Sequence, residues 1–86
     1  MKANRDSIIR KLKIARGQID GILNMVNEDR YCIDISTQLL STQALLKSTN
    51  KEILKEHINS CVKEGIEDQD YTKVEEVIKV LEKFVD

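Results

Sequence analysis

Residues 29–65 read DRYCIDISTQLLSTQALLKSTNKEILKEHINSCVKEG, and this stretch decides the fold of the chain. It contains no Pro, and its apolar residues recur at helical spacing. The pattern predicts one long helix over about residues 30–64, with Gly65 as its C-cap. The rest of the chain is expected to pack along this helix.

The last part of the predicted helix carries a His and a Cys four residues apart. On a helix, His57 and Cys61 project from one face, one turn apart. Imidazole and thiolate bind soft and borderline metal ions, so the pair is suited to be half of a metal site. Taken alone, a His and a Cys at this spacing are more often incidental than part of a metal site.

Cys32, the remaining obvious ligand, lies near the other end of the same helix. The 29 residue steps from Cys32 to Cys61 span roughly 43 Å at about 1.5 Å per residue, so no single ion joins them within one chain. Two such helices packed antiparallel across a two-fold axis would bring Cys32 of one chain beside His57 and Cys61 of the other. We therefore expect any site to be shared between subunits. The alternative is that both cysteines are core thiols.

A heptad seam predicts a first helix over about residues 7–27, with apolar side chains spaced 4, 3, 4, 3 and 4 residues apart. Its members are Ile8, Leu12, Ala15, Ile19, Ile22 and Val26. Ile9, Leu23 and Met25 widen the apolar face, which favours a bundle over an isolated coiled coil.

The polar residues 27–30 predict a short turn, and so short a connection implies antiparallel neighbours. Residues 1–6 are expected to be a frayed arm. Gly17 and Gly21 have a spacing that often marks close helix approach, although chance explains it equally well.

A third helix is predicted over about residues 72–84, after an acidic loop at residues 67–70. Thr72 and Glu75 fit a capping box at its start. The side chains expected to dock are Val74, Val77, Ile78, Leu81 and Phe84. With 34% charged and 3% aromatic residues, the 86-residue chain suits an all-α fold of three helices in one domain, residues 1–86. Its small core favours oligomerisation.

Charge is distributed unevenly around a net value of −1. Residues 1–16 hold six basic side chains against one acidic, whereas residues 62–86 hold four against eight. The basic first helix suggests a nucleic-acid surface, and the alternatives are intersubunit charge pairing or plain solvation.

No stretch is long and apolar enough to span a membrane, and no signal peptide is evident, so we expect a cytoplasmic protein. In that compartment two cysteines are more often ligands or reactive thiols than a disulfide. No acid/base pair, phosphate loop or nucleophile constellation is present, so we do not expect an enzyme.

Four segments together resemble the copper-sensitive operon repressor (CsoR/RcnR) family of bacterial metal-responsive regulators. They are KLKIARGQIDGI (residues 11–22), DRYCIDISTQL (29–39), EHINSCV (56–62) and VEEVI (74–78). The resemblance implies an all-α antiparallel dimer with a four-helix-bundle core, assembled into a dimer-of-dimers tetramer.

The resemblance also implies a Cu(I) site made by Cys32 of one chain with His57 and Cys61 of its partner. Tyr31 and Glu76 match residues that hydrogen-bond the metal-bound imidazole in the copper-sensing branch. The Glu76 match requires a one-residue shift in the acidic loop, and Glu75 is the fallback.

On the DNA side, the resemblance implies that the metal-free protein represses transcription and that Cu(I) releases it from operator DNA. The residues expected to face DNA are Arg10, Lys11, Lys13, Arg16, Lys47 and Lys51. The expected partners are double-stranded DNA, further copies of the chain as homodimer and homotetramer, and a copper chaperone.

Other branches of the family differ at the ligand positions. A nickel or cobalt sensor would have His in place of Cys61, and a formaldehyde sensor would lack Cys61 and have Pro in place of Lys2. A persulfide sensor would keep both cysteines but lack His57, so His57 favours copper. Two rivals stay open: a thiol-stress sensor using Cys32 and Cys61, and a helical interaction module that binds no DNA.

Overall fold

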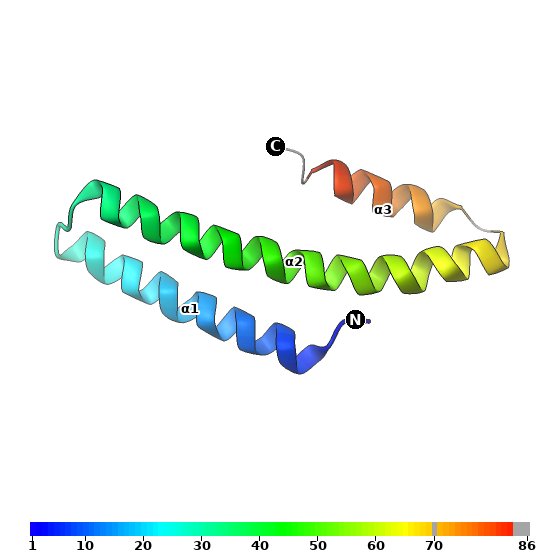
Figure 1. The fold of residues 1–86 in the computed structure, drawn as a ribbon, viewed down its shortest axis with the longest axis horizontal. Coiled ribbons are helices and arrows are strands. Elements are labelled where there is room, and N and C mark those ends of the chain that lie inside the picture. Colours follow the sequence, from blue (N-terminus) through cyan, green and yellow to red (C-terminus); the bar gives the residue numbers. More distant parts are fainter. Residues whose placement is uncertain (70, 84–86) are drawn as a thin grey trace. The chain divides into compact units, whose positions relative to one another are not determined.

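The structure, a computed structural model, describes residues 1–69 and 71–83, and it is built from three helices (Figure 1). Helix α1 spans Arg5–Asn27, α2 spans Cys32–Asp68 and α3 spans Thr72–Glu82. Within these residues there is no strand, and no helix is long and apolar enough to cross a membrane. The predicted all-α fold of three helices is therefore confirmed.

The chain divides into two compact units. The hairpin unit is Asn4–Lys51, and the C-terminal unit combines Met1–Ala3 with the chain from Glu52 onward. In the hairpin unit α1 runs antiparallel to the first part of α2, and in the C-terminal unit α3 lies along the last part of α2 (Figure 1). Helix α2 thus contributes to both units.

Helix α1 begins two residues before the predicted Ser7. The side-chain oxygen of Asn4 accepts a hydrogen bond from the backbone N–H of Ser7 at 3.1 Å. Asn is among the strongest N-cap residues, so the helix starts directly after it, at Arg5. The prediction that residues 1–6 form a frayed arm is therefore wrong for residues 4–6.

The turn after α1 is closed by a Schellman motif. The backbone N–H of Asp29 donates to the carbonyl of Val26 at 3.1 Å, and that of Arg30 donates to the carbonyl of Met25 at 3.0 Å. Asp29 has a left-handed φ of 51°, which Asp tolerates better than most residues other than Gly. This compact turn lets α2 start at Cys32 and return along α1.

The face of α1 that meets α2 is only partly the predicted heptad seam. Three of its members, Ile8, Ala15 and Ile22, are buried, whereas the other three are about half exposed. The inner seam of α1 instead consists of Ile8, Lys11, Ala15, Gln18, Ile22 and Met25. A second apolar face, here called the outer stripe, is offset from the inner seam by one residue in the sequence. It consists of the exposed Ile9, Leu12, Ile19, Leu23 and Val26. Helical periodicity allows both faces because each repeats every seven residues.

Gly17 and Gly21 are not sites of close helix approach within the chain. A Cβ added at either position would meet no atom within 4 Å. The interpretation of the pair as a packing motif therefore finds no support in this single chain.

Helix α2 continues past Gly65, the predicted C-cap, and ends at Asp68, after which Gln69 takes a left-handed φ of 56°. Gly65 is buried, and α3 packs beside this segment, where Lys73 Nζ lies 3.8 Å from a Glu64 carboxylate oxygen. Packing therefore outweighs the weak helix propensity of Gly here.

Helix α3 begins at Thr72, so the residue before it takes the N-cap position that the sequence assigned to Thr72. Tyr71 occupies the N-cap position and makes no side-chain cap hydrogen bond. Val77 is buried, with Val74 and Val80 half-buried, whereas the expected core residues Ile78 and Leu81 are 50% and 41% exposed. The predicted places of Asp70 in the loop and Phe84 in the helix lie outside the described residues.

Candidate metal centre

His57 and Cys61 lie on one face of α2 in the C-terminal unit. The Cys61 Sγ atom is 3.7 Å from His57 Nδ1, the thiol is buried and the imidazole is half-buried. With metal–sulfur and metal–nitrogen distances of about 2.3 and 2.0 Å, two such ligands on one ion lie roughly 3.5–3.8 Å apart. The donor pair therefore fits a single soft or borderline metal ion without a change of helix geometry.

Cys32, the third predicted ligand, is the first residue of α2 and belongs to the hairpin unit. Its thiol is free and exposed. In residues 1–69 and 71–83, no three His, Cys, Asp or Glu side chains are grouped so that they could hold a metal ion. One chain thus presents a two-ligand half-site and, separately, an exposed thiol.

Glu76 of α3 and His57 of α2 border the same hollow in the C-terminal unit. This hollow of about 230 Å³ is completed by the apolar side chains of Ile53, Leu54, Val77 and Val80. Glu75, the fallback in the sequence interpretation, does not line it. A carboxylate facing the imidazole could accept a hydrogen bond from the ring nitrogen not used by a metal, which favours Glu76 over Glu75.

Tyr31 precedes α2 and is 67% exposed, so its phenol is not held within its own chain. It adjoins Cys32 in the sequence, and both residues therefore stand at the same end of α2. The structure brings His57 together with Cys61, and Glu76 lines the same hollow as His57, whereas Tyr31 and Cys32 form a separate exposed pair.

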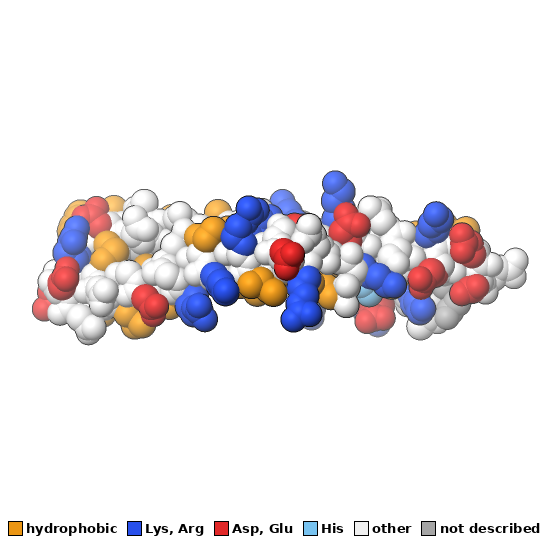
Figure 2. All heavy atoms as spheres, turned by 90° about the horizontal axis from the view of Figure 1, so that it is seen from below, with side chains coloured by type: hydrophobic (Ala, Val, Ile, Leu, Met, Phe, Trp, Pro, Cys, Tyr) orange, Lys and Arg blue, Asp and Glu red, His pale blue; other side chains and the backbone are white. Residues whose placement is uncertain are grey.

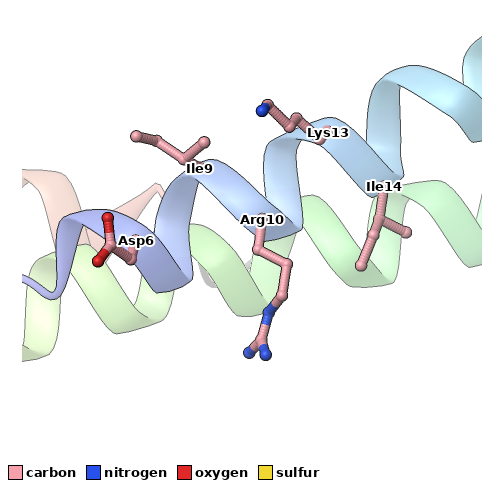
Figure 3. Close-up of a pocket in the computed structure, with 5 residues that line it drawn as sticks. All are labelled: Asp6, Ile9, Arg10, Lys13 and Ile14. Carbon is pink, nitrogen blue, oxygen red and sulfur yellow. The ribbon is translucent and has the colours of Figure 1, made fainter.

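Basic side chains gather over the region of α1, with apolar side chains between them (Figure 2). In the close-up, Lys13 and Ile9 point to one side of α1, and Arg10 and Ile14 point to the other (Figure 3). These four side chains line a shallow hollow on α1. Asp6, one turn before Arg10, also lines this hollow and adds one negative charge.

The predicted DNA-facing residues differ in exposure. Arg10, Lys13 and Arg16 are exposed, and in the described part of the chain none of them forms an ion pair with a carboxylate. Lys11 is half-buried on the inner seam, so its side chain is less accessible to DNA than those of Arg10 and Lys13. Lys47 and Lys51 are exposed on α2 in the hairpin unit.

One polar contact inside the hairpin unit was not predicted from the sequence. The Thr42 hydroxyl donates to the side-chain oxygen of Gln18 at 2.8 Å and links α2 to α1. The sequence does place two polar residues, Lys11 and Gln18, on the inner seam. The heptad analysis missed this face because the outer stripe is more apolar.

Known proteins with similar sequences are metal-sensitive transcriptional repressors. The sequence profile of the family described as "Metal-sensitive transcriptional repressor" matches residues 4–83. The copper-sensing transcriptional repressor CsoR of Bacillus subtilis is 38% identical over 81 residues, which cover 93% of this chain and 80% of that protein. The copper-sensing transcriptional repressor RicR of Mycobacterium tuberculosis is 36% identical over 62 residues, which cover 72% of this chain and 65% of RicR.

A solved structure has the same fold. The copper-sensing repressor CsoR with Cu(I) from Geobacillus thermodenitrificans superposes with a TM-score of 0.86 at 33% identity, covering 94% of this chain and 85% of that one. The similarity in sequence and in fold extends over nearly the whole chain, which confirms the family predicted from the four sequence segments. This chain therefore belongs to the family of metal-sensitive transcriptional repressors.

Proposed function

We propose that this protein is a Cu(I)-responsive transcriptional repressor whose metal site is shared between two subunits. The observation that carries the proposal is the 3.7 Å contact between Cys61 Sγ and His57 Nδ1. The third proposed ligand, Cys32, is at the opposite end of α2. Proteins that are 36–38% identical are named as copper-sensing repressors, and one structural neighbour contains Cu(I).

The donor set supports copper over other ions. Cys32, His57 and Cys61 would supply two thiolates and one imidazole, a low-coordinate set that suits a soft monovalent ion and leaves tetrahedral Zn(II) one ligand short. When bound, Cu(I) supplies one soft positive charge that all three side chains share. Glu76 lines the same hollow as His57, so its carboxylate could hold the ring nitrogen that the metal does not use.

A shared site requires an oligomer, and the apolar surface of the single chain supports one. The outer stripe of α1 stays exposed, with Leu23 at 57% and Val26 at 53%, and α2 adds Ile33 at 59% and Leu40 at 62%. Soluble monomers rarely expose large apolar patches, so side chains of this kind are suited to an interface. We propose an antiparallel dimer with a four-helix core that associates into a tetramer, in which residues 1–86 act as one functional domain.

The exposed basic side chains of α1 support operator binding. Arg10, Lys13 and Arg16 carry charges that no carboxylate in the described residues neutralises, and Lys47 and Lys51 would extend that surface. Such contacts go mainly to phosphates, so the affinity should fall steeply with salt. We propose that the metal-free protein binds DNA in the bacterial cytoplasm and acts as a regulator rather than an enzyme.

Release from DNA needs only a modest bias between two conformations. If metal favours the non-binding conformation by about 1–3 kcal/mol, operator affinity falls roughly 5- to 150-fold. All three proposed ligands lie on α2, so any metal-linked change begins in that helix.

The test is an anaerobic Cu(I) titration against a competing chelator, with the oligomer mass measured in the same buffer. We expect one tightly bound Cu(I) per chain, and we expect Cys32→Ala, His57→Ala and Cys61→Ala each to abolish it. Ser60→Ala, which changes a half-buried neighbour of Cys61, is the matched control and should bind normally.

Weak binding that His57→Ala leaves unchanged would contradict a copper site. A thiol-stress sensor would then be the second candidate, because Cys32 is an exposed free thiol. Polysulfide treatment should in that case cross-link Cys32 of one chain to Cys61 of another. The cross-linked species would appear as a covalent dimer by mass spectrometry under non-reducing conditions.

A further inference from the structure

One directional contact joins α1 to α2 inside the hairpin unit. Thr42 is only 4% exposed, and its Oγ1 lies 2.8 Å from the Gln18 side-chain oxygen and 3.2 Å from the backbone carbonyl oxygen of Gln38. A hydroxyl has a single proton, so these two acceptors compete for it. The shorter distance shows that the bond across the helices is preferred in this structure.

Most members of the inner seam of α1 are apolar, and apolar contacts lack such direction. On α2, Ile35 and Leu45 are half-buried, and the hydroxyl of buried Thr49 donates to the carbonyl of Leu45 in its own helix, at 2.7 Å. Apolar contacts depend on area and hardly on direction, so they tolerate small shifts of one helix along the other. A hydrogen bond weakens steeply with distance and angle, so the Thr42–Gln18 pair selects one register.

The second acceptor makes this contact reversible. If α1 shifts and Gln18 moves away, the Thr42 hydroxyl still reaches the Gln38 carbonyl and is not left unsatisfied. Breaking the interhelix bond therefore costs only its modest net free energy and avoids the larger penalty of an orphaned buried group. The contact can thus alternate between two satisfied states.

We propose that Thr42 and Gln18 are positioning residues that hold α1, with its basic side chains, in the register on α2 that binds operator DNA. This inference rests on the proposed function. Since all the proposed ligands lie on α2, a metal-linked change reaches α1 through the contacts between the two helices. The Thr42–Gln18 hydrogen bond is one of those contacts, and its directionality favours one register.

The first experiment needs neither copper nor DNA. Thermal or urea unfolding is measured for Thr42→Val, Gln18→Met and the double variant, which together form a double-mutant cycle. We expect the decrease in stability of the double variant to be smaller than the sum of the two single decreases. Additive decreases would mean that the two side chains do not interact, which would overturn the proposal.

The second experiment measures operator affinity of the full-length protein with and without Cu(I). Thr42→Val should weaken metal-free binding by roughly 3- to 10-fold, the factor of one net hydrogen bond, and should leave the Cu(I)-loaded protein unchanged. The ratio of the two affinities then shrinks by the same factor. Thr42→Ser, which keeps the hydroxyl, should restore the ratio.

Thr49→Val is the matched control, because it removes an equally buried hydroxyl that makes no bond to α1. A Thr42→Val ratio equal to that of Thr49→Val would overturn the positioning role. Failure of the proposed function would look different: Cu(I) would then leave operator affinity unchanged in the wild-type protein as well, and the regulatory part of this inference would fall with it.

Discussion

His57 Nδ1 and Cys61 Sγ lie 3.7 Å apart on one face of α2, and no third His, Cys, Asp or Glu in the described residues completes a metal site with them. In the site that we propose, the remaining ligand comes from another molecule. Cys32 is the exposed first residue of α2. In an antiparallel dimer, Cys32 of a second chain could therefore lie beside His57 and Cys61 of the first. This relationship leads to a test that needs no structure of the complex.

Mixed dimers should recover copper binding that neither parent variant shows. Cys32→Ala and Cys61→Ala proteins are unfolded together and refolded as a 1:1 mixture. Each mixed dimer then contains one intact site, so random pairing should restore about a quarter of the wild-type Cu(I) per chain. Copper is measured by chelator competition, and each refolded parent alone is the control. A mixture that binds no more than its parents would rule out a shared site.

Glu76→Gln should weaken Cu(I) binding by about 10- to 100-fold, the usual cost of removing a residue that orients a metal-bound imidazole. Glu75→Gln is the matched control, since Glu75 is exposed and does not line the hollow beside His57. Chelator competition measures both affinities. Equal effects of the two substitutions would mean that Glu76 acts only through net charge.

Lys13→Ala should weaken binding to every DNA sequence to a similar degree. It should also reduce the slope of log affinity against log salt by about 0.9 for each phosphate that the protein no longer neutralises. Lys63→Ala removes an exposed Lys from the C-terminal unit and should change neither quantity. Fluorescence anisotropy over a salt series gives both values. Copper affinity should stay unchanged, and an unaltered salt slope in Lys13→Ala would remove this residue from the DNA surface.

Ile19→Gln should lower the mass of the oligomer, because Ile19 is 46% exposed on the outer stripe of α1 and burying a polar amide there is unfavourable. The exposed polar Asn24 provides the control substitution Asn24→Gln. Sedimentation equilibrium at several concentrations measures the association constants. If Ile19→Gln associates as strongly as wild type, the outer stripe is not part of an interface.

Asp29→Gly should stabilise the fold by about 0.5–1 kcal/mol, because Gly adopts the left-handed φ of this turn without the strain that Asp bears. The melting temperature measured by circular dichroism should rise by a few degrees. Asp20→Gly in the middle of α1 should lower it, since Gly is the poorer helix former there. A lower melting temperature for Asp29→Gly would show that the Asp side chain itself stabilises the turn.

The sequence by itself determined the number of helices, the antiparallel return of α2 and the pairing of His57 with Cys61. These features follow from local rules: helical periodicity, a polar turn too short for any other connection, and a spacing of one helical turn. The separation of Cys32 from the other two ligands follows equally from helix rise.

Only the tertiary structure decided which face of α1 packs inward, where α2 ends and which of Glu75 and Glu76 lines the hollow beside His57. Two faces of α1 share the same seven-residue period, and the more apolar one stays outside, while the inner seam includes Gln18 bonded to Thr42. Gly65 remains helical because α3 packs over that segment. In each case local preference allowed more than one solution, and contacts between residues distant in the sequence selected one.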